Sequence, residues 1–340
     1  MVSKRFWKKK KVLVTGASFI GSHLIDRLVD MGTKVRVVNI SKKHLPFFSK
    51  LVRSGSVEFI SRDLRNLENA QKSVRGIDIV FHLACNYGGR GYIDLHQGST
   101  SSNLLLDGSV FLASLNERVE KVVFASSGCV YPNFLQTDPN KTIYLKEEMV
   151  KPPYDVDNMY GWAKLMGEMT LRAYYRDFGL KSVSCRYFSV YGEREAENHA
   201  VIAMIAKAFI RQNPYEIWGT GEQIRNWTYV ADTVEGTLLA AEKINDATSV
   251  NLGTTERTKV IDAAREILRC TGSNAKIKVL PSMPTGPYNR VADNRLAKKL
   301  LGWEPQVKFM DGLHRTIEWY FANKNENQIR NCLKKILLGS

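Results

Sequence analysis

Three features are scarce in this 340-residue sequence: long apolar runs, paired cysteines and acidic residues. No run of eighteen apolar residues occurs, so we expect no membrane span. The five cysteines show no CxxC spacing, which indicates reduced thiols and favours a cytoplasmic protein without a metal site. The basic first residues lead into an expected strand instead of an apolar signal region, so we do not expect secretion.

The shortage of acidic residues leaves a net charge of +15, from 49 lysines and arginines against 34 aspartates and glutamates. Such a balance suits an anionic partner. Nucleic acid is not the partner that we expect, because the basic residues are spread over the chain and no nucleic-acid-binding motif occurs. A dinucleotide and a nucleotide-diphosphate sugar carry several phosphates that a basic cleft would attract. Most of the basic side chains are expected simply to face solvent.

The most informative stretch of the chain lies between residues 121 and 164. Its first part, Lys121–Ala125, predicts a buried strand that ends in two serines, of which Ser127 is the second. Ligands bind at the carboxyl ends of strands in open α/β sheets. Tyr160 and Lys164 lie four residues apart in a helix-forming context and therefore share a helix face. Because an ammonium group favours a nearby phenolate, we expect Lys164 to lower the pKa of Tyr160 toward the working range of a base.

Ser127, Tyr160 and Lys164 match the serine, the YxxxK tyrosine and the lysine of the short-chain dehydrogenase/reductases. The chain resembles the extended, nucleotide-sugar-modifying branch of that family over nearly its whole length. The resemblance implies an α/β fold: a doubly wound parallel sheet (Rossmann-like) that binds NAD(P), with a smaller C-terminal α+β lobe for the substrate. It also implies that Tyr160 takes a hydroxyl proton while hydride leaves the same carbon, and that Ser127 holds the resulting carbonyl.

A glycine loop over residues 16–21 follows an expected strand, Lys11–Thr15, and precedes a helical pattern from Ser22 to Met31. This order makes a phosphate site from a helix amino terminus. The family's usual loop reads TGxxGxxG, whereas this loop is one residue shorter and carries Ser18 in place of the middle glycine. We therefore expect a phosphate site with altered local geometry. The cofactor contacts expected from the loop are Gly16, Ser18, Phe19, Ile20 and Gly21.

The adenosine end of the cofactor is expected beside the next strands. The strand over Lys34–Val38 is followed by Asn39, not by the acidic residue that binds a free 2′-hydroxyl, so both NAD and NADP stay open. The resemblance places Asp63 at the adenine amino group. His82 lies within an apolar run and is expected to be structural. The remaining cofactor contacts that the family implies are Leu64, Leu83, Ala84, Tyr160 and Lys164.

Cys129 and His199 are candidate acid/base groups. Cys129 lies two residues after Ser127, so the two side chains would share one face of an extended segment. At this point the chain resembles GDP-mannose 3,5-epimerases and GDP-fucose synthases, whose cysteine moves a proton on a carbon next to a transient ketone. The second acid/base group of those enzymes precedes a helix of the substrate lobe, where His199 stands here. A histidinium at that place would favour the thiolate of Cys129.

The substrate contacts follow from the same resemblance. Glycines 88 and 89 permit close approach of backbone to a ligand and resemble the sugar-contacting loop of the 3,5-epimerases. Arg225 and Arg290 match two arginines of the family, and Arg225 is expected to clamp the diphosphate. Ser189 replaces the family's sugar-contacting asparagine. The expected substrate contacts are Gly88, Gly89, Arg90, Ser127, Ser189, Asn198, Arg225 and Arg290.

These patterns predict a dinucleotide-binding domain over residues 1–185 and a substrate lobe over 186–340, with segments of the lobe interleaved back into the first domain. The expected activity is epimerisation of a nucleotide-diphosphate sugar, with a GDP-sugar favoured, through a transient 4-ketone in a 3,5-epimerase-like homodimer. The alternatives are a 4-keto-sugar reductase of the GDP-fucose synthase type, a simple 4-epimerase and, from another class, a non-catalytic dinucleotide-binding regulator. The basic segment 325–340 is expected to form an amphipathic helix that packs on the lobe.

Overall fold

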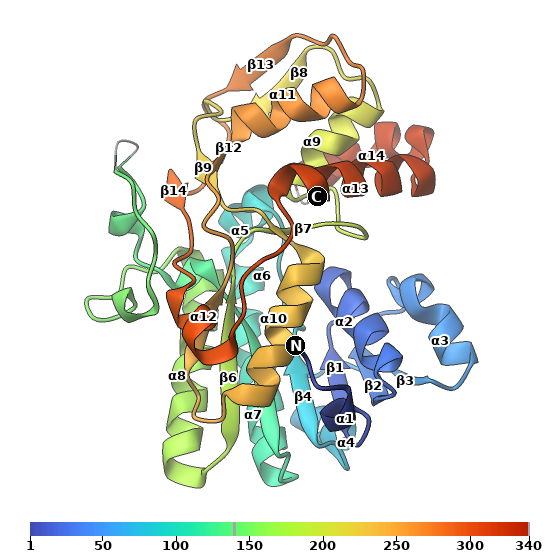
Figure 1. The fold of residues 1–340 in the computed structure, drawn as a ribbon, viewed down its shortest axis with the longest axis vertical. Coiled ribbons are helices and arrows are strands. Elements are labelled where there is room, and N and C mark those ends of the chain that lie inside the picture. The colour runs from blue at the N-terminus through green and yellow to red at the C-terminus, as the bar shows by residue number, and fades with distance from the viewer. Residues whose placement is uncertain (139–140, 339–340) are drawn as a thin grey trace.

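A seven-stranded, all-parallel sheet forms the centre of the larger part of the molecule (Figure 1). The computed structural model describes residues 1–138 and 141–338. The strands are rich in valine and isoleucine and mostly buried, as expected where helices cover both faces of a sheet. In order across the sheet they are β11 (Ser249–Leu252), β6 (Lys181–Tyr187), β5 (Lys121–Ser127), β4 (Ile79–His82), β1 (Lys11–Thr15), β2 (Lys34–Asn39) and β3 (Val57–Ser61).

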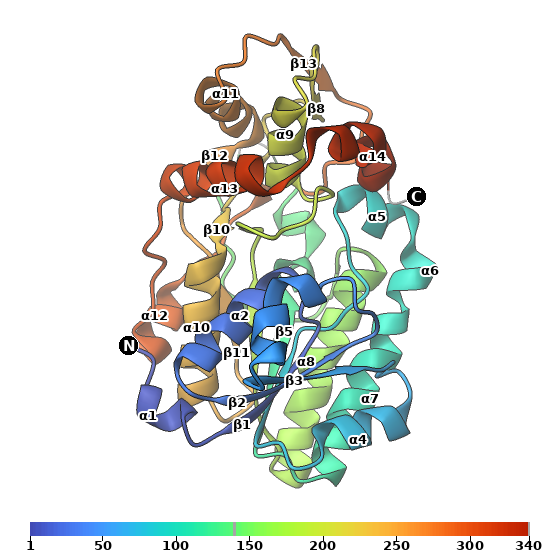
Figure 2. The same cartoon turned by 90° about the vertical axis from the view of Figure 1, so that its right-hand side faces the viewer.

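Helices cover the two faces of this sheet, as Figure 2 shows. Leu24, Leu238 and Trp303 belong to the core that lies between the sheet and one helical layer. That layer contains α2 (Phe19–Asp30), α10 (Val230–Lys243) and α12 (Arg295–Leu301). The opposite layer contains α4 (Leu67–Val74), α7 (Ser102–Asn116) and α8 (Asn158–Phe178). The predicted doubly wound α/β fold is therefore confirmed.

The C-terminal lobe, which was predicted to hold the substrate and is called the substrate lobe below, stands above the carboxyl ends of the strands (Figure 1). It has its own core, which includes Ile205, Tyr215, Ile267 and Leu313. Its elements are β7 (Val190–Tyr191), α9 (Ala200–Phe209), β8 (Tyr215–Trp218), β9 (Ile224–Arg225), β10 (Thr228–Tyr229), β12 (Thr258–Lys259), α11 (Val260–Cys270), β13 (Ile277–Leu280), β14 (Asn289–Arg290), α13 (Phe309–Asn323) and α14 (Glu326–Leu338). Short helices and 3-10 turns complete the chain: α1 (Lys4–Trp7), η1 (Leu45–Phe48), α3 (Ser49–Arg53), α5 (Arg90–Leu95), α6 (Gln97–Thr100), η2 (Gly128–Val130), η3 (Asn133–Leu135) and η4 (Glu147–Met149).

Two local predictions differ from the structure. Helix α2 begins at Phe19, three residues before the predicted Ser22, because the shortened loop brings the buried Phe19 directly into the first turn. After Ser127 the chain turns into η2 and does not stay extended, so strand alternation does not explain where the Cys129 side chain lies. The predicted boundary between residues 185 and 186 falls within β6.

The predicted C-terminal helix is present as α14. Its Ile329 and Leu333 are buried in the core of the substrate lobe, which confirms packing on the lobe. Residues 339–340 of the predicted helix lie outside the described residues. Within the described part of the chain, no helix combines the length and the apolar character that crossing a membrane requires. All five cysteines are free thiols, as predicted.

Candidate active site

Ser127, Tyr160 and Lys164 lie together where β5 ends and α8 begins. Ser127 is the last residue of β5, and its side chain is near enough to the Tyr160 phenol to act on the pKa of that group. Tyr160 and Lys164 stand one turn apart near the start of α8. The Lys164 ammonium lies 5.7 Å from the centre of the Tyr160 ring and 4.6 Å from that of Phe124. The strand end and the helix face that the sequence predicts therefore bring these three side chains to one place.

The predicted pKa of Tyr160 is wrong for this structure. Burial raises the pKa of the phenol well above its usual value of 10, with the Cys85 and Cys129 thiols acting in the same direction. The nearby Ser127 hydroxyl lowers it again only in part. Loss of hydration therefore outweighs the ammonium of Lys164, and Tyr160 keeps its proton in this state of the protein.

Lys164 and the glycine loop fit a bound dinucleotide. Lys164 is 1% exposed, and within the described chain its ammonium has no hydrogen-bond partner. A buried ammonium needs acceptors, and the hydroxyl groups of a ribose are of that kind. Gly16 has a φ of +75°, and a Cβ there would lie 2.5 Å from the backbone of Ala84, so this position requires glycine. The amino terminus of α2 follows directly.

A cavity beside the glycine loop collects most of the predicted cofactor contacts: Gly16, Ser18, Phe19, Asn39, Asp63, Leu64, Leu83 and Ala84. Ile20 and Gly21 lie in the first turn of α2. The Asn39 side chain accepts a hydrogen bond from the backbone N–H of Ala17 at 2.8 Å and so holds the loop. Lys43 and Arg62 line the same cavity and add positive charge beside Asn39.

Two other residues near this cavity have partners within the protein. The Asp63 carboxylate pairs with Arg65 at 2.6 Å, and this hydrogen bond lowers the pKa of Asp63. His82 is fully buried between the Thr15 hydroxyl, at 2.8 Å, and the Asp107 carboxylate, at 2.9 Å. Those contacts join β1, β4 and α7, so the structural role predicted for His82 is confirmed.

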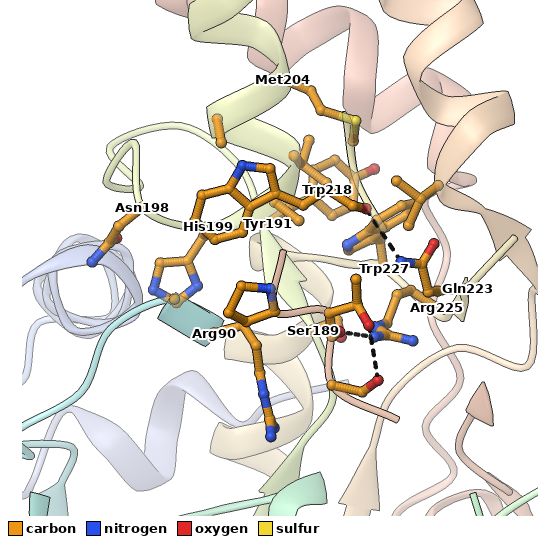
Figure 3. Close-up of a pocket in the computed structure, with 18 of the residues that line it drawn as sticks. Arg90, Ser189, Tyr191, Asn198, His199, Met204, Trp218, Gln223, Arg225 and Trp227 are labelled. Carbon is orange, nitrogen blue, oxygen red and sulfur yellow. Dashed lines mark hydrogen bonds between the residues drawn. The ribbon is translucent and has the colours of Figure 1, made fainter. Parts of the chain in front are cut away.

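A second cavity lies between the substrate lobe and the loop at Gly88 and Gly89 (Figure 3). It contains every predicted substrate contact except Ser127: Gly88, Gly89, Arg90, Ser189, Asn198, Arg225 and Arg290. Trp218, Tyr191 and Met204 supply aromatic and apolar walls. A Cβ on Gly89 would lie 1.6 Å from the carbonyl oxygen of Asn198, so the close approach requires glycine. Ser189 has a φ of +35°, a conformation that asparagine, its expected family counterpart, adopts more readily.

The arginines of the second cavity are already bonded within the protein. Arg290 donates to the Cys129 sulfur at 3.1 Å and to the Asp157 carboxylate at 2.9 Å. Arg90 donates to the same Asp157 oxygen at 2.7 Å. Arg225 donates to the backbone carbonyl of Thr285 at 2.7 Å. Burial, together with the positive charges of Arg290 and Arg90, lowers the pKa of Arg225 to about 9.

His199 lines the second cavity but is not a cation. It caps the amino end of α9, with its Nδ1 3.4 Å from the Glu195 carboxylate and its ring 5.6 Å from that of Tyr87. Burial lowers the pKa of His199 to about 4, so the imidazole is neutral at pH 7. The expectation that a histidinium favours the Cys129 thiolate is therefore wrong, because the cation at the sulfur is Arg290.

A buried ion pair supports the helix that carries Tyr160 and Lys164. The Glu168 carboxylate of α8 accepts from Arg186 of β6 at 2.8 Å and from two hydroxyl groups, of Ser126 at 2.6 Å and of Ser249 at 2.8 Å. Glu168 and Arg186 are almost fully buried, and several bonds compensate their loss of water. The contacts tie α8 to β5, β6 and β11 and so hold the helix that carries Tyr160.

Sequence reasoning missed Asp157, Gln136 and Glu195. Asp157 stands directly before α8, where an N-cap is expected, but its carboxylate makes no cap bond and turns to two arginines instead. Gln136 accepts from Arg290 at 2.8 Å across 154 residues of sequence, and no local pattern indicates that contact. Glu195 lies four residues before His199 in the loop that leads into α9, and no pattern in the sequence indicates that pair.

One group of potential metal ligands occurs among the described residues. Side-chain atoms of Glu266, Cys270 and His314 lie within 4.8 Å of one another on α11 and α13. Both carboxylate oxygens of Glu266 already accept from Arg269, at 2.5 and 2.8 Å. The carboxylate is thus neutralised by a guanidinium, and hydrogen bonds to Cys270 and His314 account for the rest of the cluster.

Comparison with known proteins gives consistent results. The model of the NAD dependent epimerase/dehydratase family matches residues 12–253. GDP-mannose 3,5-epimerase 1 of Oryza sativa subsp. japonica is 31% identical over 324 residues, which cover 93% of this chain and 83% of that protein. The structure is similar to UDP-glucuronic acid 4-epimerase from Bacillus cereus, in complex with UDP-glucuronic acid and NAD: TM-score 0.80, 28% identity, 91% of this chain and 98% of that one. It is also similar to a Thermus thermophilus UDP-glucose 4-epimerase complex with NAD: TM-score 0.81, 26% identity, 92% and 100% covered.

Proposed function

The chain belongs to the NAD-dependent epimerase/dehydratase family, and we propose that it epimerises a nucleotide-diphosphate sugar, favouring a GDP-sugar, through a transient 4-ketone in a 3,5-epimerase-like reaction. The observation that carries the proposal is Cys129. Its sulfur accepts a hydrogen bond from Arg290, which lines the substrate cavity, and it follows Ser127 by two residues at the end of β5, so it lies beside both the redox centre and the place for the sugar. A reaction limited to hydride transfer at carbon 4 would not need a thiol there.

The cofactor side supports NAD as the bound group. Gly16 and the amino terminus of α2 would hold the pyrophosphate, Asn39 and Asp63 the adenosine, and Lys164 the nicotinamide ribose. NAD, when bound, supplies the hydride acceptor and donor for carbon 4 of the sugar. The NAD complexes of the two 4-epimerases named above favour the same cofactor.

The protein's own groups carry the proton transfers. Tyr160 takes the proton of the 4-hydroxyl and returns it at the end of the cycle, with Ser127 beside the phenol. Lys164 can supply the positive charge that a phenolate requires, because its ammonium has no acceptor of its own within the described chain. The 4-ketone acidifies the hydrogens on carbons 3 and 5. The neutral imidazole of His199 can then accept one of those protons, and the Cys129 thiol can supply one on the opposite face of the sugar. A proton that passes from the imidazolium to the thiolate through solvent resets the pair.

Deuterium exchange tests the proposal. When the enzyme turns over GDP-mannose in deuterium oxide, the recovered sugar should carry deuterium at carbon 3, carbon 5 or both, because a proton leaves on one face and another arrives on the other. Cys129→Ser should lower the exchange rate by about 10²–10⁴-fold, yet still permit reduction of the cofactor by the sugar. The control is Cys332→Ser, which changes a thiol on α14. Turnover without deuterium at either carbon would leave Cys129 a packed thiol and eliminate this reaction.

A 4-epimerase is the second candidate. The similar structures include UDP-sugar 4-epimerases at TM-scores of 0.80 and 0.81, and Ser127, Tyr160 and Lys164 suffice for that reaction. It inverts carbon 4 by hydride transfer and rotation of the keto sugar, so carbons 3 and 5 keep their hydrogens. UDP-glucose converted to UDP-galactose without incorporation of deuterium would support it over the 3,5-epimerase.

A keto-sugar reductase and a non-catalytic regulator are less well supported. Lys43 and Arg62 beside Asn39 suit a 2′-phosphate and hence a reductase that uses NADPH, and net consumption of NADPH by a keto sugar would reveal one. A regulator that only bound a dinucleotide would not need Ser127 beside the Tyr160 phenol or the thiol at Arg290.

We also propose that the protein is a homodimer through α7 and α8. Large apolar side chains are exposed on both helices: Leu104 (42%), Leu105 (58%), Trp162 (38%) and Met166 (44%). Pairing of this surface with a second copy would remove it from water. Light scattering should give twice the mass of the chain, and Leu105→Glu should give the monomer mass. A monomeric wild-type protein would contradict the proposal.

A further inference from the structure

We infer that Arg290 is a catalytic residue of the proposed reaction, because its guanidinium holds the Cys129 sulfur and stabilises the negative charge that forms there when the thiol gives up its proton. The role in turnover rests on the proposed function. Stabilisation of the thiolate does not, and can be measured without any substrate. This assignment goes beyond the substrate contact that the sequence predicts for Arg290.

The contact between Arg290 and Cys129 is direct and shielded from water. Nη1 of Arg290 lies 3.1 Å from Sγ of Cys129. The two residues are 9% and 8% exposed. An attraction between a guanidinium and a thiolate is stronger in such surroundings than at the surface, because little water screens it.

The orientation of the guanidinium is fixed by its other nitrogens. Nη2 donates to Asp157 at 2.9 Å, and Nε donates to Oε1 of Gln136 at 2.8 Å. Gln136 is fully buried and is held in turn, since its Nε2 donates to the backbone carbonyls of Tyr131 and Pro132, both at 3.1 Å. Rotation of the fork away from the sulfur would therefore break two further hydrogen bonds. Asp157 and Gln136 act as positioning residues for Arg290.

Among the charged groups around the Cys129 sulfur, Arg290 is the one placed to stabilise a thiolate. Three guanidinium groups, of Arg90, Arg225 and Arg290, surround the thiol and face two carboxylates, Asp94 and Asp157. The Arg225 guanidinium donates its hydrogen bonds to the backbone carbonyls of Ile224 and Thr285. His199, the expected cation, is neutral at pH 7. The phenol of Tyr160 is a further titratable neighbour and carries no positive charge.

Arg290 can serve Cys129 and the substrate together. Each terminal nitrogen of a guanidinium carries two N–H groups. One N–H of Nη1 is directed to the sulfur and one of Nη2 to Asp157, so one on each nitrogen is left for an oxygen of the sugar nucleotide. The bound substrate and the thiolate, which forms when Cys129 gives its proton to the sugar, would then share this one cation.

The test is the pH dependence of Cys129 alkylation by iodoacetamide in the substrate-free protein, followed on the Cys129 peptide by mass spectrometry. Only the thiolate reacts, so the curve of rate against pH reports its population. Arg290→Gln should slow the alkylation of Cys129 at neutral pH by about tenfold, because the thiolate loses its guanidinium partner. Arg290→Lys keeps the positive charge but loses the two-pronged guanidinium, so its alkylation rate should lie between those of the wild type and Arg290→Gln. The thiol of Cys332 serves as an internal reference.

Arg225→Gln is the matched control, because it removes a guanidinium from the same cavity without a bond to the sulfur. We expect it to change the thiolate fraction less than about threefold, by screening over the longer distance. An unchanged curve in Arg290→Gln, or equal shifts in both variants, would overturn the inference. If iodoacetamide does not reach Cys129, the S–H stretching band, isolated by subtracting the spectrum of Cys129→Ser, gives the same titration. If only the proposed function is wrong, turnover will show no deuterium exchange, while the effect of Arg290→Gln on alkylation in the substrate-free protein will still be seen.

Discussion

The two cavities differ in the groups that they leave without partners. On the cofactor side the group is a donor, the buried ammonium of Lys164. On the substrate side the cations are bonded within the protein, and the buried atoms without a partner among the described residues are acceptors, the side-chain oxygens of Glu195, Asn198 and Gln223. Of these residues, Asn198 also lines the cofactor cavity. The cofactor cavity is therefore matched to ligand oxygens. The deep part of the substrate cavity is matched to ligand hydroxyl or N–H groups.

This difference teaches that a charged side chain in a cavity need not be waiting for a charged ligand. Arg290 and Arg90 meet at Asp157, and a diphosphate has to share them with that carboxylate. Lys164 has no such competitor within the described chain. Loss of Lys164 should therefore weaken cofactor binding, whereas loss of a cation that is already paired on the substrate side should mainly disturb the protein's own contacts. The following experiments test that contrast.

The largest effect is expected for Tyr160→Phe. Loss of the phenolic proton carrier should lower turnover by about 10²–10⁴-fold, while binding of NAD and of the sugar nucleotide stays within about twofold. The control is Tyr174→Phe on the same helix, whose ring packs on Phe178. Steady-state rates and calorimetric titrations measure both quantities. If Tyr160→Phe kept most of the activity, Tyr160 would not be the group that carries the hydroxyl proton.

Lys164→Met should weaken NAD binding by about 10- to 100-fold, because a hydrogen bond to a charged group contributes about 1.5–3 kcal/mol. The same change should raise the free energy of unfolding of the cofactor-free protein by about 1–3 kcal/mol, since a buried unpartnered ammonium is removed.

Lys207→Met is the matched control for Lys164→Met. Lys207 is also buried, but its ammonium donates to the backbone carbonyl of Glu216 at 2.6 Å, so its loss should destabilise the protein. Urea denaturation without cofactor gives the sign for both variants. If the free energy of unfolding changed in the same direction in both variants, the presence or absence of a hydrogen-bond partner would not explain the effect of either lysine.

Gly89→Ala should disturb the substrate side alone. The added Cβ meets the Asn198 carbonyl, a backbone atom that cannot turn away, so we expect a loss of about 1–3 kcal/mol in stability. Sugar-nucleotide affinity should fall with it, while NAD affinity should change little. Gly98→Ala, where a Cβ meets nothing within 4 Å, is the neutral reference. A normal thermal midpoint and affinity in Gly89→Ala would show that the close approach has no functional importance.

The smallest effect is expected at Asn39. With asparagine there, NADP should bind within about tenfold of NAD, a gap of roughly 1.4 kcal/mol. Asn39→Asp retains an acceptor for the backbone N–H of Ala17 but adds a charge that repels a 2′-phosphate, so the preference for NAD should widen by about another tenfold. Fluorescence titration with both cofactors measures the ratio. A wild-type preference of a thousandfold for NAD would show that the asparagine and its basic neighbours do not act in this way.

The parts of the site that could be predicted are those in which neighbours in sequence are neighbours in space. Ser127 at the end of a β-branched strand and Tyr160 with Lys164 on one helix face are such cases, whereas the sheet was predicted through the resemblance to a known family. Arg290 shows the limit, because Cys129 and Gln136, which lie 161 and 154 residues from it, are joined to it only by the fold.

Burial was the other quantity that the sequence did not provide. The spacing of Tyr160 and Lys164 predicted an interaction between them, but not the loss of water that raises the pKa of the phenol. His199 was placed before the right helix, yet its neutral state depends on the walls around it. The single-residue shortening of the glycine loop similarly left the start of α2 uncertain by three residues, because the packing of Phe19 decides it.

The position of β11 limits how such an enzyme can be recombined. This strand comes after α9 and α10 in the chain, yet it pairs with β6 and forms an edge of the large sheet. Its Ser249 bonds to Glu168, and its Asn251 accepts from the Tyr131 hydroxyl at 2.7 Å. A chimaera that took everything after residue 185 from a relative would therefore also exchange the supports of the helix that bears Tyr160. New substrate preferences in this architecture are more readily reached by point changes around the cavity than by transplanting a module.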